Sequence, residues 1–380
     1  IFKWEVTLLN GVLPLGISFF TFQQVSFLVD TYKGEVDEFS FLDYSLFVSF
    51  FPQLIAGPIV LHKDLIGQFS DENRFKFKSE NMLVGIRYFV IGLFKKTMVA
   101  DRLSLLVAYG YKHDSQLSSF AAALVILSYT LQIYFDFSGY SDMAIGLAKM
   151  LGFDIPHNFE EPYKAKNISE FWKRWHMTMT RFFTQYVYFP LGGNRKGMAR
   201  TCLNTMIVFA LSGLWHGAGW TFVVWGVMHG VALCFHRLAK NVIQKIPSFI
   251  TFVATFAFVN LAWVFFRAET FLSAKNLIYS LLLGGKGIVP DSDMFGTFVG
   301  GNIGDFLALF FAGHTLDLIK ALISLVLLTV FLLVAILAPS SHALATKERI
   351  GRYEGIILGI MMVLSLMTFM NLSEFIYFNF

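Results

Sequence analysis

The sequence predicts an all-α integral membrane protein that crosses the bilayer several times. Hydrophobic residues make up 56% of its 380 residues and charged residues 15%, whereas a soluble domain is roughly 45–50% apolar and about 25% charged. The mean hydropathy is +0.59. Long stretches without Asp, Glu, Lys or Arg recur along the chain, and about 20 apolar residues suffice for a helix that spans a membrane. Composition and spacing therefore both favour a polytopic helical protein.

Several charge-free stretches are long enough to cross the membrane as single helices. They are Gly11–Val29, Tyr44–Leu61, Ser118–Phe135, Ser248–Phe266, Ala321–Ala338 and Gly355–Ser373. The shorter region Met82–Tyr111 and the longer run Leu203–Phe235 add further passes. We expect about eight to ten passes in one membrane domain that covers residues 1–380. Because the chain starts at Ile1 without a methionine, we also expect that an N-terminal portion is missing from it.

The run Leu203–Phe235 cannot be one straight helix. It would measure about 50 Å, whereas the hydrocarbon core of a bilayer is about 30 Å thick. Glycine tolerates the backbone angles that a break needs, so we expect the break at Gly213, Gly217 and Gly219. Broken backbone at membrane depth survives only where it is buried in protein or lines a watery cavity. His216 lies at this expected break.

Residues 151–200 form the longest stretch that is not predicted to span the membrane. A helix from Phe171 to about Tyr188, capped by Ser169-Glu170, would carry large apolar side chains and three basic ones, and Pro190 would end it. A helix of this composition is typical of the membrane interface or of a re-entrant segment.

The charged residues exclude some functions and suggest an orientation. The net charge is +4, and Lys and Arg gather in short connectors, which makes these connectors candidate cytoplasmic loops. No aromatic-basic recognition module accompanies them, so a nucleic-acid partner is not expected. Cys202 and Cys234 have no metal or disulfide spacing, and we interpret them as small buried thiols.

His216 is the main candidate for chemistry. It lies inside the charge-free run, next to the expected break, with Trp215 and Trp220 near it to wall a pocket. A neutral imidazole near pH 7 is a natural general base, and it could remove the proton from a hydroxyl that attacks an ester or thioester. A histidine in an apolar helix is more often structural, and both interpretations stay open on the residues alone. No HExxH pattern or ligand cluster predicts a metal, and no GxSxG elbow is present.

A second group of polar residues ends the stretch that starts at Ser118. Asp136 and Asp142 lie six residues apart around Ser138, Gly139 and Ser141. Carboxylates beside a spanning segment are costly unless they are paired or hydrated. The group is either a capped glycine turn that ends the helix or part of the lining of a reaction chamber.

The chain resembles the membrane-bound O-acyltransferase (MBOAT) family, in the branch of alginate and peptidoglycan O-acetylation subunits. The resemblance covers nearly the whole chain through ordered motifs. They are PLGISFFTFQQVSFLVDTYKG (14–34), FFPQLIAGPI (50–59), FDFSGYSDMAIGLAKMLGF (135–153), FWKRWH (171–176), YVYFPLGGNRKG (186–197), LWHGAGWTFVVWGVMHG (214–230), WVFFRAE (263–269) and FIYFNF (375–380).

The resemblance implies a ring of transmembrane helices, with re-entrant or amphipathic helices, around a central funnel in the bacterial inner membrane. It implies that His216 of the WHG motif is the essential catalytic residue and that His176 of the RWH motif is the second histidine of the site. No cofactor is expected. Acetyl-CoA is the expected donor on the cytoplasmic side, and a separate periplasmic O-acetyltransferase is the expected partner that modifies the glycan.

We assign further roles on this basis. Trp215 and Trp220 shape the substrate tunnel. Three polar residues, Asp136, Ser138 and Tyr140, are expected to line the chamber. Arg195 and Lys196 are expected to meet the phosphates of the donor, although an ordinary positive loop explains them equally well.

Two other functions fit the sequence. D-alanyl transfer to teichoic acid, with a carrier-protein thioester as donor, would use the same motifs. A proton-coupled transporter or flippase would also place histidines at a broken helix, although no two matching halves are apparent in the sequence.

Overall fold

The computed structural model describes residues 16–36, 38–55, 57–284, 287, 292–299, 307–348 and 351–368. Its regular elements are helical throughout these residues, which confirms the predicted class. The N-terminal part is built from the following helices: α1 (Ile17–Tyr32), α2 (Phe41–Ser49), α3 (His62–Phe69), η1 (Glu72–Arg74), α4 (Ser79–Phe94), the π-helical turn η2 (Lys95–Ala100), α5 (Asp101–Lys112) and α6 (Ser119–Met150).

The central part carries the candidate site. Its elements are η3 (Pro162–Lys164), α7 (Ile168–Arg174), α8 (Met177–Phe183), the π-helical turn η4 (Thr184–Tyr188), α9 (Gly197–His216), α10 (Trp220–Leu238), α11 (Lys240–Ile243), α12 (Ser248–Arg267) and α13 (Phe271–Leu283). The C-terminal part comprises α14 (Ser292–Val299), α16 (Gly313–Leu337), α17 (Ser341–Ala345) and α18 (Glu354–Met367).

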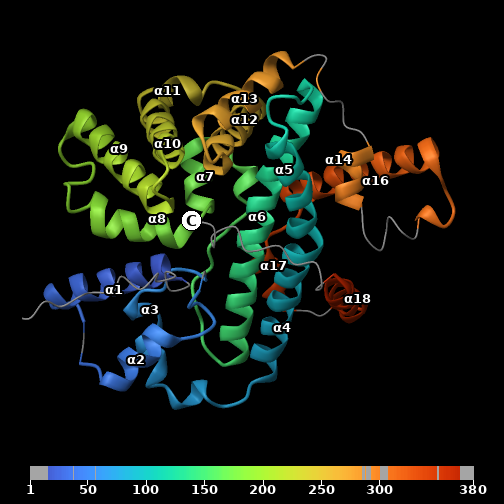
Figure 1. Ribbon diagram of the computed structural model, residues 1–380. Helices are drawn as coiled ribbons and strands as arrows, with labels where there is room; N and C mark the ends of the chain where they lie inside the picture. Colours follow the sequence, from blue (N-terminus) through green and yellow to red (C-terminus); the bar gives the residue numbers. More distant parts are fainter. Residues whose placement is uncertain are drawn as a thin grey trace, which may run out of the picture.

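Helix α6 runs through the middle of the molecule, with α4 beside it (Figure 1). In the figure, α1, α2 and α3 lie below α8, α9 to α13 form the upper part, and α14, α16 and α18 lie on the far side of α4 and α6. In α6, 83% of the spanning window is buried in protein, against 17–28% in α9, α10, α12 and α16. The central helix therefore forms the core, and the other four expose long apolar faces.

Five helices within the described residues are long and apolar enough to cross a membrane: α6, α9, α10, α12 and α16. They correspond to the predicted stretches Ser118–Phe135, Leu203–Phe235, Ser248–Phe266 and Ala321–Ala338. The predicted pass Tyr44–Leu61 is wrong, because α2 ends at Ser49 and turns follow it. A proline at position 52 and the Gly57-Pro58 pair are poorly compatible with a continuing helix.

Three other predicted passes differ in length. Helix α1 has 16 residues, and the start of the predicted stretch Gly11–Val29 lies outside the described residues. Helix α18 has 14 residues, and the end of Gly355–Ser373 likewise lies outside them, as does the closing motif at 375–380. The region Met82–Tyr111 is helical over its whole length but is divided by η2 into α4 and α5.

Candidate active site

The predicted break in the run Leu203–Phe235 is present and lies directly after His216. Helix α9 ends at His216, and α10 begins at Trp220. A Cβ atom on Gly217 would come within 2.5 Å of the Phe222 ring. Gly213 has another function, because it lies inside α9 and a Cβ there would come within 2.4 Å of the Phe222 carbonyl oxygen. The glycines thus let α9 and α10 pack closely at the break.

The His216 side chain is enclosed by aromatic rings from three helices. The residue is 3% exposed. Its ring centroid lies 4.7 Å from Trp215 of α9, 5.1 Å from Trp225 of α10 and 5.0 Å from Phe266 of α12. Aromatic walls exclude bulk water, which strengthens electrostatic interactions in the enclosed space.

His176 lies at a sharp bend, where a continuous helix was expected. Helix α7 begins after Asn167, whose side chain accepts a hydrogen bond from the Glu170 backbone N–H, and it ends at Arg174. His176 has a φ of 44° and precedes α8. The prediction of one continuous helix from Phe171 to Tyr188 is therefore wrong. A left-handed conformation costs a non-glycine residue about 1–3 kcal/mol and persists only where its surroundings hold it.

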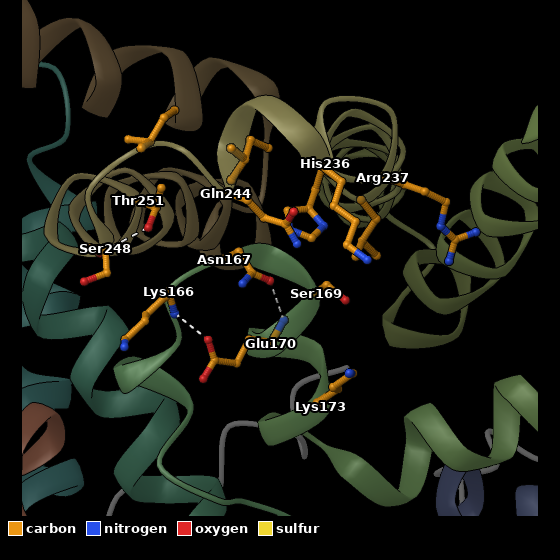
Figure 2. A pocket seen from close by; sticks show the side chains of 14 residues that line it. Lys166, Asn167, Ser169, Glu170, Lys173, His236, Arg237, Gln244, Ser248 and Thr251 are labelled. Atoms are coloured by element: carbon orange, nitrogen blue, oxygen red, sulfur yellow. Dashed lines mark hydrogen bonds between the residues drawn. The ribbon is translucent and has the colours of Figure 1, made fainter.

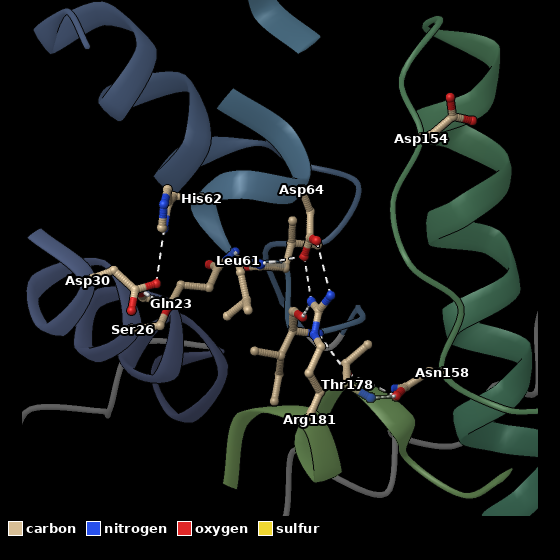
Figure 3. A network of polar contacts seen from close by, with 12 residues as sticks. Gln23, Ser26, Asp30, Leu61, His62, Asp64, Asp154, Asn158, Thr178 and Arg181 are labelled. Carbon is tan, nitrogen blue, oxygen red and sulfur yellow. Dashed lines mark hydrogen bonds and ion pairs between the residues drawn. The ribbon is translucent and has the colours of Figure 1, made fainter. Parts of the chain in front are cut away.

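Asn158 provides much of that support. Its side-chain oxygen accepts hydrogen bonds from the backbone N–H of Thr178 at 3.3 Å and from the Thr178 hydroxyl at 3.0 Å (Figure 3). The same oxygen lies 3.1 Å from Nδ1 of His176. A backbone N–H only donates, so the atom that faces it is the amide oxygen. An oxygen at Nδ1 requires a proton on that nitrogen. In neutral His176 the other nitrogen, Nε2, therefore carries the free lone pair.

Trp215 lies next to both histidines. Its ring centroid lies 6.2 Å from that of His176 and 4.7 Å from that of His216. Stacking of Phe22 at 4.7 Å and a hydrogen bond from Nε1 to the Ser18 carbonyl oxygen at 3.3 Å connect it to α1. The structure thus brings together three of the residues that the sequence singled out, His216, His176 and Trp215.

Other predicted site residues lie elsewhere. Trp220 is 72% exposed at the start of α10 and does not wall the enclosure around His216. Arg195 and Lys196 are exposed in the connector before α9. They lie at the opposite end of this helix from His216, and its 20 residues measure about 30 Å.

The contacts of Asp136 and Ser138 exclude the capped turn, which was one of the two alternatives for this group. Helix α6 continues through Gly139 to Met150, so no capped turn ends it there. Asp136 pairs with Lys96 at 2.8 Å, and the Ser138 hydroxyl accepts a hydrogen bond from Lys95 at 3.3 Å. Both polar residues therefore face α4 and η2.

Phe137 of α6 contacts His176, and the two ring centroids lie 4.7 Å apart. Phe137 lies between Asp136 and Ser138 in the sequence. Helix α6 therefore directs these two polar side chains toward α4 and η2 and the Phe137 ring toward His176. Tyr140 is partly exposed and packs against the large aromatic core.

His229 and Asn158 complete the surroundings of the site. The indole N–H of Trp172 donates to Nδ1 of His229 at 3.1 Å, so in neutral His229 the proton is on Nε2. Sequence reasoning missed Asn158, because it lies in an irregular segment 18 residues before His176 and no periodic pattern marks it. Among the described residues, no three His, Cys, Asp or Glu side chains come together as a metal site would need.

The arrangement of two buried imidazoles at a helix break defines a membrane-embedded site with a candidate general base. The chain belongs to the membrane-bound O-acyltransferase family, whose sequence model matches residues 1–275. It is 44% identical over 311 residues to a peptidoglycan O-acetyltransferase of Helicobacter pylori, which covers 74% of this chain and 59% of that protein.

The chain is also similar to proteins that are named for other acceptors. A probable alginate O-acetylase of Pseudomonas aeruginosa is 41% identical over 260 residues, which is 68% of this chain and 49% of that protein. A teichoic acid D-alanyltransferase of Bacillus subtilis is 28% identical over 281 residues, which is 69% of this chain and 70% of that protein. The chain spans about half to three fifths of the length of its O-acetylating relatives.

Proposed function

We propose that this chain is a membrane-embedded O-acyltransferase that moves acetyl groups from a cytoplasmic donor, for O-acetylation of a peptidoglycan or alginate-like polysaccharide outside the cytoplasm. The observation that carries the proposal is the pair His216 and His176 beside Trp215, in an aromatic enclosure at the break between α9 and α10. Family membership and the two O-acetylating relatives support it.

In the proposed reaction, the oxygen of an acceptor hydroxyl forms a bond to the carbonyl carbon of the donor thioester, and the carbon–sulfur bond breaks. His216 takes the hydroxyl proton and returns it to the leaving thiolate. General-base assistance of this kind contributes about 10²–10⁴ in rate. His176 orients the acceptor or shares the proton through Nε2, whose lone pair the Asn158 contact leaves available.

The proposed orientation places the start of α9 and the end of α10 on the cytoplasmic side. The two helices form an antiparallel hairpin, in which the Cys234 thiol contacts the Cys202 carbonyl oxygen and Arg237 contacts the Tyr188 hydroxyl. Basic residues gather at this end, at Arg195, Lys196, Arg200, Arg237, Lys240 and Lys245, whereas the break at 217–219 has none. Cytoplasmic ends of membrane helices carry such an excess of Lys and Arg.

This orientation fits a multi-pass protein of the bacterial inner membrane with acetyl-CoA as its donor. A periplasmic O-acetyltransferase would receive the acetyl group and modify the glycan. A histidine at a break between the two membrane faces is suitable for passing a group from one side to the other.

Replacement of His216 by alanine tests the proposal. We expect loss of O-acetyl groups from the cell-wall or exported polysaccharide at unchanged membrane levels of the protein, measured by release and quantification of acetate. His229→Ala is the matched comparison, because this buried histidine is held by Trp172 and is given no part in the reaction. Wild-type acetylation in the His216→Ala variant would refute the catalytic role.

D-alanyl transfer is the second candidate, because a D-alanyltransferase is among the relatives. The lower identity of 28%, against 44% for the peptidoglycan O-acetyltransferase, favours acetyl transfer. Measurement of ester-linked D-alanine in the same variants distinguishes acetyl transfer from D-alanyl transfer. The His216→Ala variant would lose O-acetyl esters in the first case and D-alanyl esters in the second. A transporter or flippase would leave no covalent product when purified protein is given donor and acceptor on the same side.

A further inference from the structure

The two helices that flank His176 are held in different ways. Helix α7, before it, is fixed by contacts close in sequence. The Asn167 side chain accepts a hydrogen bond from the Glu170 backbone N–H, and the Glu170 carboxylate accepts one from the Lys166 backbone N–H, each at 2.9 Å (Figure 2). Helix α8 follows His176 directly, and the His176 side chain makes no capping hydrogen bond to it. The place of α8, and with it that of His176, therefore depends on contacts with other parts of the fold.

A buried strap of chain from the N-terminal part provides such contacts. The strap comprises residues 59–64, ends in the first turn of α3 and is at most 1% exposed over its first three residues. The Ile59 backbone N–H donates to the Thr178 hydroxyl of α8 at 3.0 Å. This hydroxyl in turn donates to the Asn158 oxygen that faces Nδ1 of His176. The strap thus reaches the buried histidine through two side chains.

Arg181 makes the second connection between α8 and the strap. Its guanidinium contacts both carboxylate oxygens of Asp64, through Nη1 to Oδ1 at 3.0 Å and through Nη2 to Oδ2 (Figure 3). Nη2 also donates to the Ile59 carbonyl oxygen at 3.4 Å. Arg181 lies three residues after Thr178, so the two side chains share one face of α8. Because a paired arginine–carboxylate contact fixes orientation as well as distance, these contacts define both the position and the rotation of α8.

The strap is held on its other side by α1. The Gln23 side chain donates to a backbone carbonyl oxygen of the strap at 3.5 Å. Nδ1 of His62 lies 3.4 Å from Oδ2 of Asp30, whose side chain is fully buried (Figure 3). Helix α1 also supports Trp215 by a ring stack and a hydrogen bond. The strap therefore joins α1, which contacts Trp215, to α8, which begins directly after His176.

The exposure of the Arg181–Asp64 pair indicates that geometry, rather than stability, is its main contribution. The two side chains are 36% and 21% exposed, and ion pairs in contact with water add little to the stability of a fold. Catalysis is more sensitive, because displacement of a group by about 1 Å can cost about 10² in rate. Removal of the pair is therefore expected to change the rate much more than the stability.

We propose that Arg181 and Asp64 are positioning residues, which hold α8 on the strap and thereby keep His176 in its place beside Trp215 for acyl transfer. The inference rests on the proposed acyl transfer and adds two residues that act through His176 rather than on the substrate. Asn158 fixes which nitrogen of His176 carries the proton, and the Arg181–Asp64 pair fixes where the ring lies.

Acetyl-transfer kinetics of the purified protein in nanodiscs test the proposal. We expect Arg181→Gln to lower kcat about tenfold and to change the KM for acetyl-CoA by less than about twofold, because the pair orients a group that acts in the chemical step. The matched control is Arg74→Gln, since Arg74 likewise pairs with a carboxylate, that of Asp154, and donates to a backbone carbonyl, that of Gly152. Arg74 joins η1 to the segment after α6, and its variant is expected to keep the wild-type kcat. Equal losses of kcat in both variants would overturn the proposal.

A double-mutant cycle tests whether the two residues act as one unit. Asp64→Asn removes the charge and keeps an oxygen for the Leu61 backbone N–H, which donates to Asp64 at 2.9 Å. The double variant Asp64→Asn/Arg181→Gln is expected to lose no more kcat than Arg181→Gln alone, because both residues contribute to one contact. Losses that multiply in the double variant would show independent roles and overturn the assignment.

Chemical labelling of His176 distinguishes failure of this inference from failure of the proposed function. Diethyl pyrocarbonate modifies accessible neutral imidazoles, and mass spectrometry identifies the modified residue. His176 is 0% exposed, and we expect its modification to be at least about threefold faster in Arg181→Gln. Wild-type kcat with wild-type labelling in this variant would refute the inference and leave the proposed function standing. Faster labelling of His176, in a protein whose wild type transfers no acetyl group, would refute the proposed function and leave the hold on His176 standing.

Thermal unfolding separates a positioning role from a general loss of structure. The Tm of Arg181→Gln is expected to match that of Arg74→Gln, because both variants remove a partly exposed ion pair. Modification of the buried His229 is expected to stay at its wild-type rate. A much lower Tm for Arg181→Gln, with His229 and His176 labelled faster to the same degree, would show that the whole fold is loosened and would overturn the proposal.

Discussion

Two buried histidines of this protein hold opposite tautomers, because each faces a different neighbour. The Asn158 oxygen requires a proton on Nδ1 of His176, whereas the Trp172 indole N–H requires a lone pair on Nδ1 of His229. A neutral imidazole acts as a base only through its bare nitrogen. The neighbour, rather than the histidine itself, therefore decides which ring nitrogen can accept a proton.

Substitution of Asn158 tests whether this side chain fixes the tautomer of His176. Asn158→Leu removes the acceptor at Nδ1 and is expected to lower kcat at least about tenfold, because part of the general-acid–base contribution is lost when the tautomer is no longer fixed. KM for the donor is expected to change little. Asn158→Asp keeps an acceptor at the same place and is expected to recover much of the activity in the same kinetic assay.

Thr178→Val is the matched control for Asn158. It removes one hydrogen bond to the same oxygen, and another from the Ile59 N–H, without touching His176. A loss of kcat in Thr178→Val as large as that in Asn158→Leu would mean that the whole loop, rather than the tautomer, is responsible.

The features of the candidate site that depend on local pattern could be predicted from the sequence. His216 and Trp215 lie beside glycines inside a charge-free run, and the break follows from length alone. The left-handed bend at His176 is supported by Asn158 and Thr178, whose contact joins residues 20 positions apart in the sequence. No local spacing encodes such a contact, so the bend and its support could not be predicted.

At the scale of elements, α6 shows how a charged segment can continue as a buried helix. A Cβ atom on Gly139 would lie 2.7 Å from the Gly92 carbonyl oxygen, and the absence of one lets α4 and α6 touch. Lys95 then reaches Asp142 at 2.8 Å across 47 residues of sequence. Because these partners are remote in sequence, the carboxylates suggested a turn or a chamber and not an ion-paired helix interface.

Gly139→Ala tests the close approach of these two helices. The added methyl group meets backbone that cannot give way locally, so overpacking is expected to cost about 1–3 kcal/mol and to lower the Tm of the detergent-solubilised protein. Gly67→Ala is the control, since a Cβ there meets nothing within 4 Å. Equal Tm values for the two variants would show that the helices can separate without cost.

A contact between α17 and the segment after α6 predicts a pH dependence of stability. The rings of His157 and His342 stack at 4.7 Å. Burial, and after it the neighbouring His342, holds the pKa of His157 below its ordinary value of 6.5, although Glu160 acts in the opposite direction. Between the two pKa values the unfolded chain binds more protons, so this contribution to stability is complete above 6.5 and is lost as the pH falls.

Thermal unfolding at about pH 8 and about pH 5.5 tests whether stability falls with the pH, as predicted. The wild type is expected to lose more Tm on acidification than His157→Gln, whose side chain does not titrate. A variant that loses as much as the wild type would show that other groups cause the dependence. A wild type that gains stability at the lower pH would reverse the predicted direction.

At the scale of the whole molecule, length and apolar composition predicted the class and the longest helices, but not that every apolar stretch is a single helix. The stretch Tyr44–Leu61 has the composition of a pass, yet only its first part is helical. The end of this stretch instead supports the site, because the Ile59 N–H donates to the Thr178 hydroxyl. Directly after the stretch, Asp64 of α3 pairs with Arg181 of α8 (Figure 3). Hydropathy measures the preference for an apolar environment, which a protein interior satisfies as well as lipid does.

The hairpin of α9 and α10 makes the proposed orientation testable. In a background with Cys202→Ala and Cys234→Ala, single cysteines would be placed at Asn194 and at Ala218, both of which are exposed. The first lies at the basic end and the second lies in the break after His216. A membrane-impermeant maleimide is expected to label the Ala218→Cys protein in intact spheroplasts, and the Asn194→Cys protein only after permeabilisation, because basic connectors stay in the cytoplasm.

Each labelling pattern bears on how an acetyl group would cross the membrane. The expected pattern places the break after His216 where water enters from outside, and the basic end of the hairpin where a cytoplasmic donor can reach it. The reverse pattern would put the basic end of the hairpin outside the cell, where acetyl-CoA is not supplied, and would contradict the proposed direction of transfer. Absence of labelling at Ala218→Cys from either side would show that the break is closed to water, and it would contradict the proposed opening of the break to the outside.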